Sequence, residues 1–174
     1  MAGSTNGKIL EVTAKTLLLV PGTTTNLALA LKLAEAGLAG RPESPSRQTT
    51  RGMAAYRLGR WHEALTWLEP ARTNRDPEIA CLAGYFAAMA RQQLGETTPA
   101  KATLEQARQR LAPVLHRGHL GRNWEDLGRC LIVQTEAERL ILGREVSPPV
   151  TAESLAAARE NPKAARELPK EGRK

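Results

Sequence analysis

Small and apolar residues recur at intervals of three and four along most of this chain, which is the spacing of one face of an α-helix. β-Branched and aromatic residues, which strands favour, are scarce after the first 25 positions. The pattern therefore predicts an all-α fold. We expect helices in five stretches with this spacing: 26–39, 47–58, 61–71, 79–94 and 98–113.

Glycine and proline mark the expected helix ends. Gly59 and Gly95 each follow a helical stretch, where glycine supplies the left-handed conformation that ends a helix. Thr98 is the expected N-cap of the next stretch, with Pro99 at the first helical position, where its missing N–H costs nothing. Pro70 is expected to kink or shorten its helix, and Pro113 to end the last of the five.

A sequence repeat organises the middle of the chain. A shift of 36 residues gives ten identities over positions 53–77, among them Met53 with Met89 and Leu68 with Leu104. Chance would give roughly one or two at ordinary residue frequencies. A period of this length is typical of stacked helical hairpins. The chain therefore contains two predicted repeat units, at about 46–77 and 79–113.

The flanking stretches are less regular. Within the N-terminal segment 1–22, residues 7–20 are interpreted as the first helix of a degenerate repeat, although their β-branched residues would also suit a strand. A helix at about 123–142 is expected to cap the last core surface, closing a domain at 23–143. Residues 144–174 hold hardly any large apolar side chain, which predicts a disordered, charged tail.

These repeats resemble the tetratricopeptide repeat (TPR). Small residues stand where that family has them, which lets the helices approach closely: Gly52 and Ala88, Ala64 and Ala100, Ala71 and Ala107. The resemblance implies a short right-handed solenoid of antiparallel helix pairs with a C-terminal capping helix. Similar modules often form the C-terminal part of larger bacterial proteins, including kinases and WD-repeat proteins. Arg51 departs from the pattern, because its place usually holds Leu.

Charge, cysteine content and the lack of long apolar runs indicate where the protein is located in the cell. The formal charge is +7, and the 25 Lys and Arg residues alternate with Glu along the chain, so most are expected on solvated helix surfaces. Cys81 and Cys130 fall in apolar helical patterns, which predicts core positions and a reducing compartment. No secretory signal and no run of about 20 apolar residues is found, so we expect a cytoplasmic protein.

Patterns that carry catalysis or metal binding are not found. His116 and His119 form one weak pair, whereas zinc sites show two close pairs of ligands. No glycine-rich phosphate loop is present. Cys81 lacks a suitably spaced base that would make it a nucleophile. We therefore expect no enzyme activity, no metal and no cofactor.

The TPR resemblance implies a protein-interaction scaffold. In that family the first helix of each pair lines a concave groove that receives a peptide or a partner helix. The groove positions carried onto this chain are Thr49, Met53, Tyr56, Arg57, Leu82, Tyr85, Met89, Gln92 and Gln93. Methionine beside tyrosine suits adaptable binding. Packing of Met53 and Met89 between helices is an equally supported alternative.

RNA binding is the competing function. The charge of +7 and the basic run over residues 116–122 suggest it, because neutralised phosphates contribute much of nucleic-acid affinity. Few aromatic side chains are free to stack on bases, which argues against it. The partner is therefore expected to be a protein or peptide, with nucleic acid second and membrane excluded.

Overall fold

The computed structural model describes residues 3–22, 24–116 and 124–143. The helices are α1 (Gly3–Leu18), α2 (Thr24–Ala39), α3 (Pro45–Arg57), α4 (Trp61–Leu68), the 3₁₀ helix η1 (Glu69–Thr73), α5 (Pro77–Gln93), α6 (Thr97–His116) and α7 (Trp124–Leu142). No strand occurs in these residues, which confirms the all-α prediction. The chain divides into two units, Met1–Arg144 and Glu145–Lys174. The predicted tail lies outside the described residues.

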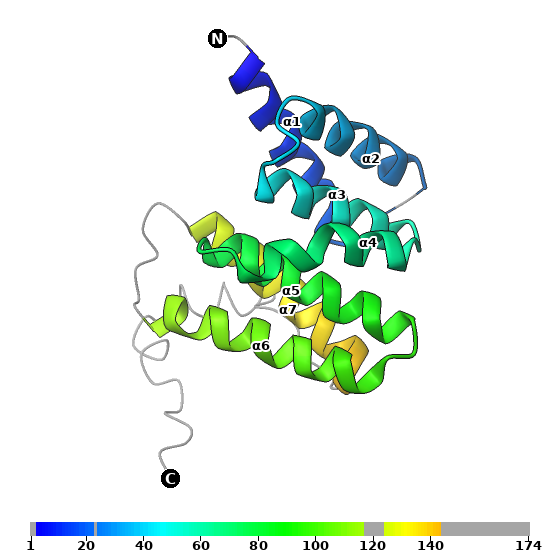
Figure 1. The fold of residues 1–174 in the computed structure, drawn as a ribbon, viewed down its shortest axis with the longest axis vertical. Coiled ribbons are helices and arrows are strands. Elements are labelled where there is room, and N and C mark those ends of the chain that lie inside the picture. The colour runs from blue at the N-terminus through cyan, green and yellow to red at the C-terminus, as the bar shows by residue number, and fades with distance from the viewer. Residues whose placement is uncertain (1–2, 23, 117–123, 144–174) are drawn as a thin grey trace, which may run out of the picture. The chain divides into compact units, whose positions relative to one another are not determined.

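The helices of the first unit form pairs in two layers (Figure 1). Helix α1 pairs with α2, α3 with α4, and α5 with α6. The odd-numbered helices also pack on one another in series, whereas each even-numbered helix packs mainly on odd-numbered neighbours. We call α1, α3, α5 and α7 the odd-helix layer. This arrangement is that of a TPR-like helical repeat, as the sequence period predicts.

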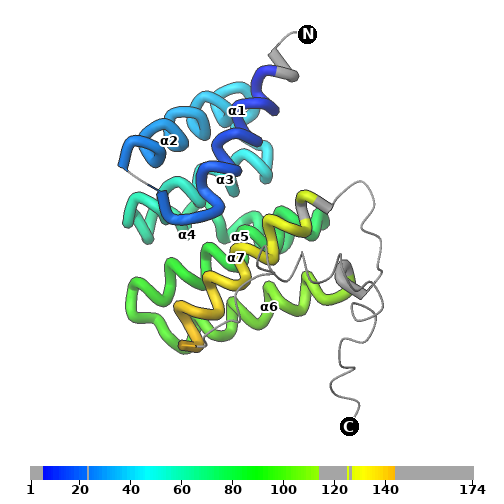
Figure 2. Tube along the Cα trace, turned by 180° about the vertical axis from the view of Figure 1, so that it is seen from behind, coloured from blue at the N-terminus to red at the C-terminus, as the bar shows by residue number. Residues whose placement is uncertain are grey.

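Helix α7 departs from the regular stacking of the pairs. It packs chiefly against α5 and less against α6. Figure 2 shows it beside α5, on the same side of the molecule as α1. The buried residues of α7 follow the three-and-four spacing of one helical face: Cys130, Val133, Ala137 and Ile141. Helix α7 thus closes the odd-helix layer with an apolar stripe.

Both repeats end their first helix in the same backbone motif. Gly59 and Gly95 have φ angles of 74° and 80°. In each case the amide of the following residue donates to the carbonyl five residues earlier, at 2.9 Å. This is the Schellman arrangement, which satisfies carbonyls at a helix end and favours glycine at the left-handed position. The predicted role of both glycines is confirmed.

The prolines and caps are only partly as predicted. Helix α4 ends at Leu68 and continues as a 3₁₀ turn containing Pro70, so the predicted shortening is confirmed. The prediction that Pro113 ends its helix is wrong, because α6 continues through it. Pro113 is exposed and lies in the last turn of α6, where water can satisfy the freed carbonyl.

The start of α6 also differs from the prediction. The amide of Ala100 donates to the Glu96 carbonyl at 2.9 Å, which makes Glu96 the N-cap. Helix α6 begins at Thr97, so the assignment of Thr98 as N-cap is wrong. Pro99 is still in the first turn, where no hydrogen bond is lost.

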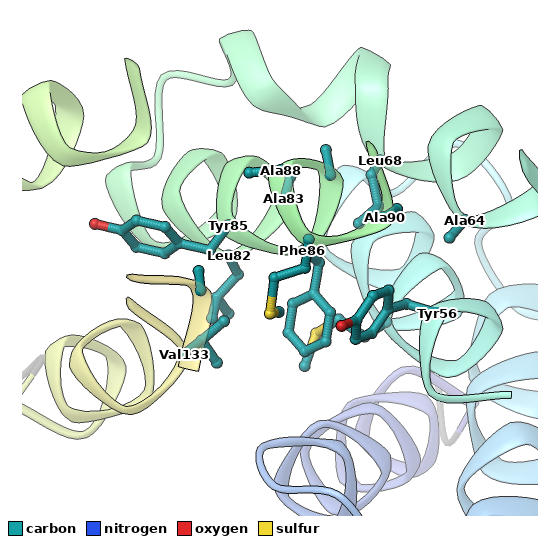
Figure 3. Packing of buried hydrophobic residues seen from close by; sticks show 14 of the residues in the cluster. Tyr56, Ala64, Leu68, Leu82, Ala83, Tyr85, Phe86, Ala88, Ala90 and Val133 are labelled. Atoms are coloured by element: carbon teal, nitrogen blue, oxygen red, sulfur yellow. The ribbon is translucent and has the colours of Figure 1, made fainter. Parts of the chain in front are cut away.

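Helix α5 is the centre of the core. Every residue from Ala80 to Ala90 is buried. Alanines such as Ala83 and Ala88 leave room for neighbouring helices, and the larger side chains fill what remains (Figure 3). The rings of Tyr56 and Phe86 meet edge to face, with centroids 5.4 Å apart. Close approach of helices therefore depends on small residues.

Helices α5 and α6 approach each other closely at Gly84. A Cβ added there would lie 2.8 Å from Ala107 Cβ. We predict that Gly84→Ala lowers the free energy of unfolding by about 1–3 kcal/mol, because the helices must move apart. Urea denaturation followed by circular dichroism measures the change.

Gly128 provides the matched control for this substitution. It lies within α7, and a Cβ added there meets no atom within 4 Å. Gly128→Ala should raise the free energy of unfolding by about 0.5–1 kcal/mol, since alanine favours the helical conformation. Effects of the same sign at both glycines would contradict the proposed close approach of α5 and α6.

Candidate functional site

The residues predicted to line a groove are mostly buried in this structure. The apolar and aromatic residues among them share one hydrophobic cluster with residues of α1 and α7. The buried members are Thr49, Met53, Tyr56, Leu82, Tyr85 and Met89. Gln92 is half-buried and Gln93 is exposed, whereas Arg57 is half-buried as a whole residue but has a buried side chain. In this fold Met53 and Met89 therefore pack between helices, which was the alternative to binding.

Tyr56 and Tyr85, the two tyrosines among the predicted groove residues, keep their hydroxyl protons. The Tyr85 hydroxyl donates to Gln134 Oε1 of α7 at 3.3 Å. Burial raises the pKa of Tyr85 far above its usual range. Burial and the nearby Glu136 carboxylate raise the pKa of Tyr56 as well. Both phenols are thus neutral in the physiological range, and Tyr85 helps to fix α7.

Arg57 joins three elements of the odd-helix layer. Its Nε and Nη2 donate to the carbonyls of Leu18 and Leu19, each at 2.9 Å, at the C-terminal end of α1. Its Nη2 also donates to Glu136 Oε2 of α7 at 2.6 Å, and Nη1 donates to the other carboxylate oxygen. The pair is bidentate, the strongest geometry for arginine and carboxylate. One side chain of α3 therefore anchors both α1 and α7.

Aromatic rings complete the surroundings of Arg57. Its guanidinium carbon lies 5.0 Å from the centroid of Phe86 and 5.6 Å from that of Tyr56. Such contacts between a cation and ring faces add stabilisation when the cation is desolvated. The Arg57 side chain is only 4% exposed. Its place in the predicted groove is therefore structural in this fold.

Two further arginines are buried, contrary to the expectation of a solvated surface. Arg51 is 8% exposed and pairs with Glu63 of α4 at 2.5 Å and Glu35 of α2 at 3.3 Å. Arg47 donates to the Gly37 carbonyl at 2.8 Å. Arg51 thus links three helices electrostatically at a place where TPR sequences usually have Leu.

The two cysteines meet at the contact between α5 and α7. Both thiols are buried, as predicted. A hydrogen bond from Cys130 lowers the pKa of the Cys81 thiol. The Cys81 thiol also donates to the Ala107 carbonyl at 3.6 Å. Their separate places in the sequence gave no sign of this contact.

In the part of the chain that the structure describes, no group of three His, Cys, Asp or Glu side chains is arranged so that it could hold a metal ion. None of the described helices is both long and apolar enough to cross a membrane. The basic run over residues 116–122 begins at the end of α6 and otherwise lies outside the described residues.

A polar cavity of about 450 Å³ lies where the first turns of α3, α5 and α7 meet α1. Sequence reasoning missed it, because its residues come from several helices and each resembles an ordinary surface charge. The one local sign was Lys15, which follows Ala14 on the buried face of α1. The charged residues that line the cavity are Lys8, Glu11, Lys15, Arg41, Arg47, Glu78, Glu125 and Arg129.

We predict that Arg57→Met lowers the free energy of unfolding by about 2–4 kcal/mol, because it leaves two carbonyls at the end of α1 and the partly buried Glu136 carboxylate unpaired. Glu136→Gln should have a smaller effect, since the amide still accepts a hydrogen bond. The exposed Arg60 serves as control, and Arg60→Met should change stability little. Urea denaturation measures all three, and equal losses in the Arg57 and Arg60 variants would contradict the anchoring role.

Comparison with known proteins identifies a family for the central part of the chain. The family model described as T7SS, ESX-1 secretion system protein EccA1, N-terminal domain, matches residues 22–123. Searches of curated proteins and of solved structures give no match. The match supports a TPR-like helical domain, and the finer resemblance to C-terminal modules of kinases or WD-repeat proteins stays a prediction.

The matched range includes α2 to α6 and leaves out α1 and α7. The two helices that Arg57 anchors therefore lie outside the part that the family model describes. The match nevertheless extends over more than half of the 174 residues. The chain belongs to the family of the N-terminal domain of the ESX-1 secretion system protein EccA1.

Proposed function

We propose that this chain is a protein-interaction module that binds its partner on the exposed surfaces of α1 and α7. The observation that carries the proposal is the distribution of large apolar side chains that remain exposed in the described residues. Of the seven, six lie on or directly after α1 or on α7: Ile9, Val12, Val20, Leu131, Ile132 and Leu140. Large apolar side chains left exposed on these two helices are ones that a protein partner would cover on binding.

The family supports a role in protein binding. EccA1 is described as a secretion system protein, and helical repeats of this kind present extended surfaces to partners. We therefore propose a protein component of a secretion system as the partner. We propose no reaction for the chain, and the absence of enzyme activity stays a prediction.

In this structure, helix α7 covers the residues that were predicted to line the groove. The apolar stripe of α7 packs against the buried residues of α3 and α5, in the way that an amphipathic ligand helix packs into a helix-binding groove. A partner helix could occupy the same groove only after α7 moves away. We propose instead that residues such as Leu82 and Tyr85 support α7 from beneath, and that the partner contacts its outer surface.

RNA binding is less well supported. The described residues hold 16 Lys and Arg against 13 Asp and Glu, so much of the excess charge of +7 belongs to the rest of the chain. The arginines at the centre of the fold are paired with glutamates. The rings of Tyr56, Tyr85 and Phe86 are buried, which leaves them unable to stack on bases.

We predict that a photo-crosslinking amino acid at Ile132, on the outer surface of α7, captures a protein partner in the native host. The same amino acid at Lys101, exposed on α6, is the control and should capture none. Mass spectrometry of the adducts, with and without nuclease treatment, distinguishes protein from nucleic acid.

The outcomes separate the two candidate functions. A nuclease-resistant protein adduct at position 132 alone supports the proposal. Protein adducts at position 101 and not at 132 would place the partner on the even-numbered helices and contradict it. Adducts that nuclease removes would favour RNA binding.

A further inference from the structure

We propose that the polar cavity between α1 and the first turns of α3, α5 and α7 binds an acidic peptide segment that also carries an apolar side chain. This inference rests on the proposed function, because it names the chemistry of the protein partner. It is supported by the charges on the floor of the cavity, the charges at its rim and the apolar side chains beside it.

The floor of the cavity is a network of ion pairs centred on a buried lysine. Lys15 is 4% exposed, and its Nζ lies 3.4 Å from both Glu11 Oε1 and Glu78 Oε1. The same ammonium group donates to Ser46 Oγ at 3.2 Å. Arg129 of α7 approaches Glu78 Oε1 at 3.1 Å. The network thus ties α1, α3, α5 and α7 together at one place.

Two more pairs complete this network. Arg47 Nε lies 3.6 Å from Glu11 Oε2, and Arg129 Nη2 lies 3.7 Å from Glu125 Oε2. Lys15, Arg47 and Arg129 therefore face three carboxylates. Since these charges balance, the floor holds its own side chains in place and attracts neither anions nor cations strongly.

The rim supplies the unbalanced charge. Lys8 and Arg41 line the cavity, are exposed, and form no ion pair with any described residue. Helix α3 begins at the cavity, and its N-cap Ser44 makes no side-chain capping bond. The partial positive charge of this helix end adds to the two cations. The mouth of the cavity therefore attracts an anion.

Apolar side chains beside the rim favour an acidic peptide over a phosphate backbone as the bound anion. Ile9 is 59% exposed and Val12, which lines the cavity, is 38% exposed. They are three residues apart on α1, so they lie on the same face. An acidic peptide can use these contacts with an apolar side chain, whereas a phosphate backbone cannot. The volume of about 450 Å³ also suits a peptide side-chain cluster better than a single inorganic ion.

The test titrates the full chain with the peptide Glu-Glu-Leu-Glu-Glu-Leu and follows its backbone amides by NMR. The double variant Lys8→Glu and Arg41→Glu should weaken binding by about tenfold, because it reverses both unpaired charges at the rim. Ile9→Ala should also weaken binding, by severalfold, through loss of apolar contact. The variants change exposed residues, and circular dichroism confirms that they fold.

Lys32→Glu with Lys101→Glu is the matched control, since it makes the same charge change on exposed residues outside the cavity. Binding that both double variants weaken equally would show only general attraction to a basic protein and would overturn the proposal. The same holds if inorganic phosphate or oligouridylate binds the cavity as tightly as the peptide.

The outcomes also separate this inference from the proposed function. If the peptide fails to bind while Ile132 still captures a protein, the partner does not use the cavity and the protein-binding function stands. If the peptide binds in the cavity while Ile132 captures nothing, the cavity proposal stands and the proposed surface on α7 is wrong.

Discussion

The guanidinium of Arg57 is the point at which the odd-helix layer is held together. It comes from α3, neutralises Glu136 of α7 and donates hydrogen bonds to the carbonyls at the C-terminal end of α1. A buried charge of this kind is costly unless every donor is used. Because its partners belong to both outer helices, those helices must be docked for the charge to be satisfied. Arg57 therefore has all its hydrogen-bond partners only when α1 and α7 are both docked on α3 and α5.

Closure of the layer determines which surfaces are left for function. Once α1 and α7 are docked, the methionines and tyrosines of α3 and α5 become core, and the outer faces of α1 and α7 become the accessible surface. Small residues such as Gly84 allow the layers to approach closely enough for this packing. The cavity at the start of α3, α5 and α7 is the place where charged side chains replace apolar packing.

Much of the fold follows from local sequence signals, and the candidate site does not. The 36-residue repeat predicts the hairpins, and Gly59 and Gly95 predict where their first helices end, because these signals act within one helix or turn. The partners of Arg57 are 38 to 79 residues away, so no local pattern reveals them. The groove assignment assumed that the first helix of each pair faces solvent, which depends on where α7 docks. The cavity likewise exists only because four helices meet.

The two cysteines provide the most direct test of closure by α7. Cys81 and Cys130 are the only cysteines in the chain, and they lie on opposite sides of the contact between α5 and α7. The measurement is the rate at which a thiol reagent labels both residues in the native protein. If α7 closes the layer, both thiols react far more slowly than in the unfolded chain and speed up together in Arg57→Met. Native labelling of either thiol at the unfolded rate would show that α7 is not docked and would contradict the account.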